Sequence, residues 1–199
     1  MYTQKTVKEY IDSLAARESV PGGGSATALT GALGAALLEM VCNFTLENEK
    51  YKDIEGVIAG CLGSIKRIRE EYLLLVDEDT KVYSSICAAF RAKDEKMIEG
   101  ALKRGYDISL KMCSLAKSGM EIARHLSEGS NFNLISDVGC GAEILNACFK
   151  AGAFNSEINL GGIKDPAFMK KERSALDALK KDIAVLYEKA IAEADKRMV

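Results

Sequence analysis

The chain is poor in residues that interrupt helices and in residues that bind metals. It has 199 residues but only two prolines, no tryptophan and a single histidine, His125. Proline averages about 5% of residues in globular proteins, so its scarcity favours long, unbroken helices. Six cysteines are present, but no two form a C-x-x-C pair. The usual zinc and haem-attachment patterns are therefore absent.

The chain also lacks a large excess of either charge. Lys and Arg number 27 against 29 Asp and Glu, which gives a net charge of -2 and no basic surplus for nucleic acid. The length suits one domain, residues 1–199, that needs no disulfide or structural metal. The N-terminal stretch is charged and amphipathic, unlike a signal peptide. We therefore expect a cytoplasmic protein with reduced thiols and no membrane or nucleic-acid partner.

Apolar residues recur at helical spacing along most of the chain, and no stretch alternates as a strand would. The fold class predicted is all-α, an antiparallel bundle of five to seven helices. Thr3 is the predicted N-cap of the first helix, and Ser25 that of a second ending near 43–48. Further helices are predicted over 53–90, with a possible bend near Asp77, and over 94–126, 133–153 and Asp165-Pro166 to the C-terminus. Residues 127–131 and 155–164 are expected to be irregular.

A glycine-rich loop gives the strongest local signal. Val20-Pro21-Gly22-Gly23-Gly24 precedes Ser25, and the segment from Ser25 to Leu38 has no charge and many small residues. A transmembrane helix needs about 20 apolar residues, so this shorter run favours a buried central helix. Free backbone N–H groups at its start could bind an anion or a carbonyl. A tight, close-packed turn explains the glycines equally well.

Asp79 departs from an apolar stripe that includes Tyr72, Leu75, Val82 and Ile86. Its neighbour Asp77 can turn toward solvent, whereas Asp79 falls where a core residue is due. Asp79 is either a solvated residue at a helix bend or a partly buried carboxylate with a raised pKa, suited to acid–base chemistry.

Other polar residues have simpler explanations. Asp137 lies in the first turn of a predicted helix, where a carboxylate is ordinary capping chemistry. His125 is expected to be solvated near a helix C-terminus, and the cysteines to act as small buried hydrophobes.

Three segments together resemble the formiminotransferase-cyclodeaminase family. They are VPGGGSATALTGALGAALLEMVCNFT (20–45), VDEDTKVY (76–83) and SNFNLISDVGCGAEILNACFKAGAFNSEINL (130–160). The resemblance implies an all-helical homodimer that binds a tetrahydrofolate derivative near the subunit interface, without a tightly bound cofactor. It implies a cyclodeaminase, which forms methenyltetrahydrofolate and ammonia from formiminotetrahydrofolate, or a methenyltetrahydrofolate cyclohydrolase. A separate formiminotransferase would be a further partner.

The resemblance also suggests roles for individual residues. Asp79 matches the DED-type motif and would be the acid–base group. Asp137 matches the N-x-x-S-D motif and would orient substrate or act as a second acid–base group. The residues that would bind substrate are Gly22, Gly23, Gly24, Ser25, Asn43, Asn131, Asn133 and Ser136.

The chain departs from the family's sequence pattern at two places. The family often has Gly-Asn-Pro-Asn where this chain has residues 130–133, and commonly has a Lys where this chain has Gly161. Lys50 and Arg124 are candidate substitutes for holding the glutamate tail of a folate. A non-catalytic helical dimerisation or binding module is the alternative to an enzyme.

Overall fold

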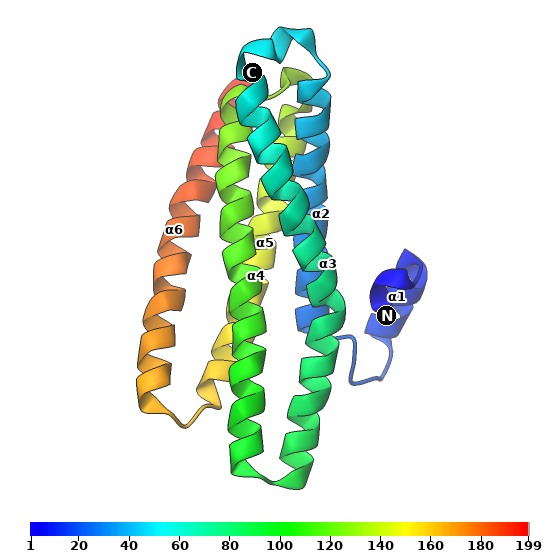
Figure 1. Cartoon of the computed structure of the whole chain (residues 1–199), viewed down its shortest axis with the longest axis vertical. Helices are drawn as coiled ribbons and strands as arrows, with labels where there is room; N and C mark the ends of the chain where they lie inside the picture. The colour runs from blue at the N-terminus through cyan, green and yellow to red at the C-terminus, as the bar shows by residue number, and fades with distance from the viewer. Residues whose placement is uncertain (199) are drawn as a thin grey trace.

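The computed structural model describes residues 1–198 and confirms the all-α bundle (Figure 1). Its six α-helices are α1 (Val7–Ala15), α2 (Gly23–Leu46), α3 (Glu55–Ala92), α4 (Glu95–Gly129), α5 (Ile135–Gly161) and α6 (Pro166–Met198). Three short 3-10 helices accompany them: η1 (Tyr2–Gln4) precedes α1, η2 (Glu49–Ile54) lies between α2 and α3, and η3 (Phe132–Leu134) lies between α4 and α5. No strand occurs within these residues.

Helices α2 to α5 form an antiparallel group, with α2 and α4 running opposite to α3 and α5 (Figure 1). Helix α2 packs on α3 and α5, α4 packs on the same two helices, and α6 covers α4 and α5. Helix α1 stands beside this group, next to the middle of α3 in the view of Figure 1.

Small residues let α2 approach its neighbours closely. Ala28, Ala35 and Leu38 are fully buried. A Cβ on Gly31 would come within 2.4 Å of the Tyr72 ring of α3, so only glycine fits there. The helix is long and apolar enough to span a membrane by length and composition. Its buried face instead packs on α3 and α5, although Leu33 and Phe44 on its outer side stay exposed.

The two predicted N-caps were wrong. Thr6, not Thr3, caps α1, in a capping box with Glu9. The Thr3 hydroxyl instead donates to Asp77. Helix α2 begins at Gly23, so Ser25 lies in its first turn and is completely buried. Sequence spacing could not show these differences because tertiary contacts use the two side chains.

The possible bend near Asp77 is absent, and parts of the two regions predicted to be irregular are helical. Helix α3 runs without a break past Asp77, which is buried and accepts hydrogen bonds from Thr3 and from the Tyr2 backbone rather than turning to solvent. Helix α4 continues to Gly129. Helix α5 continues to Gly161, although 155–164 was expected to be irregular. The helix of Asp165-Pro166 is confirmed: Asp165 Oδ1 accepts from the backbone N–H groups of Ala167 and Phe168.

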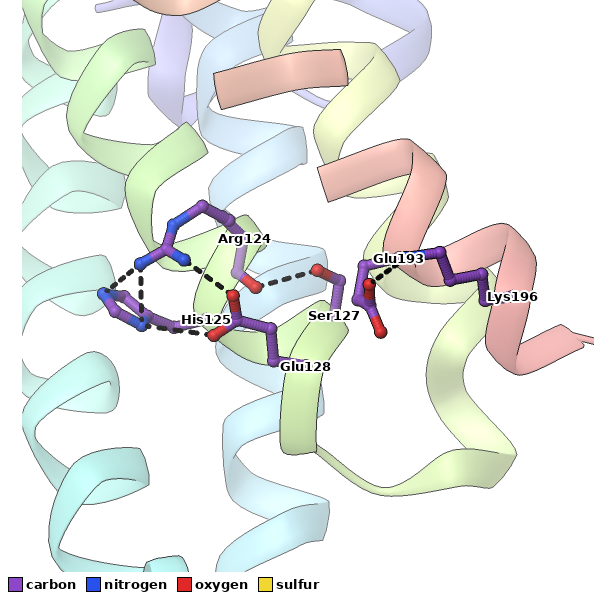
Figure 2. Close-up of polar contacts among 6 residues, drawn as sticks. All are labelled: Arg124, His125, Ser127, Glu128, Glu193 and Lys196. Carbon is purple, nitrogen blue, oxygen red and sulfur yellow. Dashed lines mark hydrogen bonds and ion pairs between the residues drawn. The ribbon is translucent and has the colours of Figure 1, made fainter. Parts of the chain in front are cut away.

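The C-terminal end of α4 is held by polar contacts, some of which Figure 2 shows. His125 is exposed and lies beside Arg124 and Glu128, which confirms its predicted solvated position. Arg197 of α6 donates to the carbonyl oxygens of Leu126, Ser127 and Ser130. The Leu126 carbonyl also accepts from the Ser130 backbone N–H, so the guanidinium adds to the hydrogen bonds at the end of α4, where the last carbonyls lack partners within the helix.

Candidate active site

A cavity of about 450 Å³ lies among α2, α3, α4 and α5, in the half of the bundle where α2 begins. Its volume is within the range of small-molecule sites. Residues 22–24 form one wall, at the start of α2. The other walls come from residues 79–90 of α3, 102–109 of α4 and 155–162 of α5. The glycine loop and Asp79, far apart in the sequence, therefore face one space.

Asp79 lies directly against the backbone of α2. A Cβ built on Gly24 would be 2.0 Å from Asp79 Oδ1, so the absence of a side chain at residue 24 makes room for the carboxylate. Asp79 is the one charged residue among those that line the cavity within the described chain. The carboxylate thus meets the N-terminal turn of a helix, where backbone N–H groups are unpaired.

Burial raises the pKa of Asp79 above its ordinary value, because a low-dielectric environment disfavours the charged form. A hydrogen bond from the Ser25 backbone N–H acts in the opposite direction and keeps the ionised form accessible. A carboxyl with a raised pKa and access to a cavity is suited both to accept and to donate a proton. The partly buried interpretation of Asp79 is therefore correct, and the solvated helix bend is not found.

Two asparagines on α5 complete the polar side of the cavity, and sequence reasoning missed both. The Asn159 amide nitrogen donates to the Asn155 carbonyl oxygen at 2.8 Å. A Cβ on Gly105 of α4 would meet Asn159 Oδ1 at 2.9 Å, so this glycine makes room for the amide. Both residues fell in the region expected to be irregular. The helical spacing of four between them was the signal available.

Most of the remaining cavity wall is apolar. Tyr83 and Phe90 on α3 are about half exposed, and Ile158 on α5 is largely exposed. Val82, Ile86 and Leu102 line the same side. The cavity therefore joins a polar region containing one carboxyl and two amides to an apolar region that suits a flat or aromatic group.

The other predicted site residues lie at the opposite end of the bundle. Asn43, Asn131, Asn133, Ser136 and Asp137 gather where α2 ends and α5 begins. Asn43 and Gly24 are 19 positions apart on one helix, which separates them by about 28 Å. Asn131 is buried, and its amide contacts the Phe44 carbonyl and the Asn133 backbone N–H. Within one chain these five residues do not face the Asp79 cavity.

Several candidate groups are occupied elsewhere or lie far from the cavity. The hydroxyl of Ser25 is 3.0 Å from that of Tyr10, so its polar atom already has a partner. Lys50 and Arg124, suggested for the glutamate tail, lie near the opposite end. No Lys or Arg is found among the cavity's described lining residues.

The cysteines do not supply a reactive thiolate at the cavity. Burial raises the pKa of Cys42 and Cys113 to about 12 and that of Cys148 to about 11. Cys140 is exposed, contrary to the expectation that all the cysteines are buried. Within residues 1–198, no three His, Cys, Asp or Glu side chains are grouped so that they could hold a metal ion.

The chain is similar to known proteins over most or all of its length. The chain is 29% identical over 198 residues to methenyltetrahydrofolate cyclohydrolase of Methylorubrum extorquens, covering 95% of both chains. It is 23% identical to rat formimidoyltransferase-cyclodeaminase, of which it spans 34%. The crystal structure of formiminotetrahydrofolate cyclodeaminase from Thermotoga maritima superposes over the whole of both chains with a TM-score of 0.96 at 26% identity. The family model described as formiminotransferase-cyclodeaminase matches residues 6–178, and the chain therefore belongs to that family.

Proposed function

We propose that this protein is a folate one-carbon enzyme, and that its reaction is the cyclodeaminase conversion of formiminotetrahydrofolate to methenyltetrahydrofolate and ammonia. The observation that carries the proposal is Asp79, a half-buried carboxyl with a raised pKa against the start of α2, in a cavity of suitable size. The superposition on the Thermotoga cyclodeaminase supports the same reaction.

The reaction requires one proton to move between two nitrogens. N10 of the folate attacks the carbon of the protonated formimino group, forming the new C–N bond. The Asp79 carboxylate takes the proton that N10 loses. The resulting carboxylic acid donates this proton to the amino nitrogen of the former formimino group. That nitrogen leaves as ammonia when its bond to the carbon breaks. One group of intermediate pKa thus acts first as base and then as acid.

Different walls of the cavity would bind different parts of the substrate. The amides of Asn155 and Asn159 offer donors and acceptors to the polar pterin ring and formimino group. The apolar wall around Phe90 and Ile158 suits the benzoyl ring. Because no basic residue of the described chain (1–198) lines the cavity, the anionic glutamate tail would extend outside it.

Cyclohydrolase activity is the second candidate, and the Methylorubrum relative, aligned over almost its full length, favours it. In that reaction Asp79 would take a proton from water as the water attacks the methenyl carbon. It would then return that proton to the ring nitrogen whose bond to that carbon breaks, while the hydroxyl formed from the water loses its remaining proton to solvent as the formyl carbonyl forms. Both reactions place the same carboxyl beside the same carbon.

The experiment follows methenyl absorbance with the purified protein and each folate in turn. Accumulation of methenyl product from formiminotetrahydrofolate supports the cyclodeaminase. No such product, together with rapid hydrolysis of methenyltetrahydrofolate, supports the cyclohydrolase. Asp79→Asn is expected to lower turnover by about 10²-fold or more, whereas Asp177→Asn, an exposed carboxylate of α6, is a matched control. Absence of turnover on both folates would favour the non-catalytic module instead.

We also propose a homodimer. The outer sides of α2 and α5 expose Leu33, Phe44, Phe154 and Ile158, whose exposed fractions run from 54% to 76%. A second copy that covered these side chains would remove apolar surface from water. Only a second copy could bring a residue such as Asp137 near the Asp79 cavity. A monomer mass by light scattering would contradict this proposal.

A further inference from the structure

The N-terminal segment is attached to the bundle at two points that lie on either side of Asp79. The Thr3 hydroxyl and the Tyr2 backbone N–H donate to Asp77, two residues before Asp79 on α3. The Tyr10 hydroxyl of α1 meets the Ser25 hydroxyl at 3.0 Å, one residue after Gly24 on α2. These are polar attachments to the two helices that hold the carboxylate.

The attachment points are buried, although most of α1 is not. Tyr10 is 5% exposed and Ser25 is fully buried, whereas Val7 and Ile11 of α1 are 76% and 55% exposed. A nine-residue helix is too short to be stable alone, so its contacts must hold it in place. The buried hydroxyl pair is expensive to break, because either oxygen would then lose its partner in the interior.

Tyr10 is therefore connected to the carboxylate through a single residue. The Ser25 side chain contacts Tyr10, and the Ser25 backbone N–H contacts Asp79. We propose that Tyr10 is a positioning residue: its hydroxyl fixes Ser25, and Ser25 fixes the first turn of α2 against the Asp79 carboxylate. This inference rests on the proposed acid–base role of Asp79. It also gives Ser25 a supporting role instead of a direct contact with substrate.

Few ionisable groups besides Tyr10 surround Asp79. Tyr10 approaches from the N-terminal segment, and Asp77 and Tyr83 lie on α3 itself. The described cavity lining from α2, α4 and α5 contains no charged side chain. The Ser25 N–H is thus the main contact that favours the ionised carboxylate, against burial, which disfavours it. If Ser25 moves, the pKa of Asp79 rises further.

Turnover of Tyr10→Phe, Ser25→Ala and the double variant tests the proposal. Each single variant is expected to lower kcat about tenfold with KM within twofold, and to move the acid limb of the pH–rate profile to higher pH. The double variant should resemble the single variants, because both break one connection. Tyr72→Phe is the control: it removes another buried hydroxyl, bonded to the Met112 carbonyl, and should leave the acid limb in place.

A second measurement does not depend on turnover. With ¹³C-labelled aspartate, the Asp79 carboxyl signal, assigned by its loss in Asp79→Asn, gives the pKa directly in each folded variant. A higher pKa in Tyr10→Phe but not in Tyr72→Phe supports the proposal even if neither folate reacts, and in that case only the proposed function fails. A Tyr10→Phe pKa equal to or below that of wild type overturns the positioning role, even in a fully active enzyme.

Discussion

Replacing Gly24 by alanine is the sharpest perturbation that the site offers. The added Cβ would be 2.0 Å from Asp79 Oδ1 and 2.4 Å from Asp79 Cγ. These distances are far below van der Waals contact. The obstruction is the carboxyl group itself rather than the end of a long flexible side chain. Either the carboxylate or the first turn of α2 must move.

The size of the movement determines the expected effect. Restoring an ordinary contact of about 3.4 Å requires a shift of roughly 1.4 Å. A displacement of about 1 Å at a catalytic group can reduce the rate about 10²-fold, so kcat should fall by that factor. Overpacking costs about 1–3 kcal/mol of stability. The greater helical preference of alanine, about 0.5–1 kcal/mol, offsets part of this loss.

Gly23→Ala is the matched control, since it adds the same methyl group one residue earlier in the same helical turn. That Cβ would meet only Asn155 Oδ1, at an ordinary 3.7 Å. Turnover of both variants is measured on the folate that the wild-type protein uses, and chemical denaturation gives their stabilities. If Gly24→Ala keeps the turnover of the wild-type protein, the close approach of Asp79 to α2 does not support catalysis.

Three further predictions concern stability. Burial raises the pKa of Asp79 in the folded protein, so the free energy of unfolding of the wild type should fall as pH rises from below the pKa of the unfolded state through that of the folded state. Asp79→Asn carries no such charge and should have a higher Tm than the wild type at pH 7. This difference in Tm should vanish below about pH 3, where Asp79 is protonated in both states. Gly31→Ala should destabilise the bundle by about 1–3 kcal/mol through contact with Tyr72, whereas Gly63→Ala, where no atom lies within 4 Å, should stabilise it by about 0.5–1 kcal/mol in denaturant titrations. Arg197→Ala should cost about 2–4 kcal/mol, because carbonyls at the end of α4 lose a charged donor; an unchanged Tm would show that water replaces it fully.

Helical periodicity predicted most of the fold because the apolar stripes are long and prolines are rare. The errors occur where tertiary contacts override local preferences. Thr3 has the side chain of an N-cap, but Asp77 takes its hydrogen bond. Residues 155–161 have weak helical signals, yet α5 continues because Leu160 is buried beside α4 and Asn159 fits against Gly105.

The sequence pointed to a candidate site residue where that residue broke a strong apolar pattern. It did not single out the two asparagines of the cavity, which lie outside such a pattern. Asp79 interrupts an apolar stripe, so partial burial was one of the two interpretations that the sequence offered. Asn155 and Asn159 interrupt no pattern, because the predicted helix ended at residue 153 and they follow it in a region expected to be irregular. Asn131 shows a different limit: a motif suggested substrate binding, but motif order does not give distance. Within one chain the residue lies at the far end of α2 from Asp79, and its role in binding stays a prediction.

The surroundings of Asp79 are difficult to explain as packing alone. An apolar side chain at residue 79 would continue the stripe formed by Leu75 and Val82 and would not carry the desolvation penalty of a carboxylate. Glycine at residue 24 weakens the start of α2, yet it leaves the space that the carboxylate occupies. Two separate departures from the most stable sequence therefore converge on one carboxyl group beside a cavity. Such local violations are expected where chemistry, rather than stability, constrains the residues.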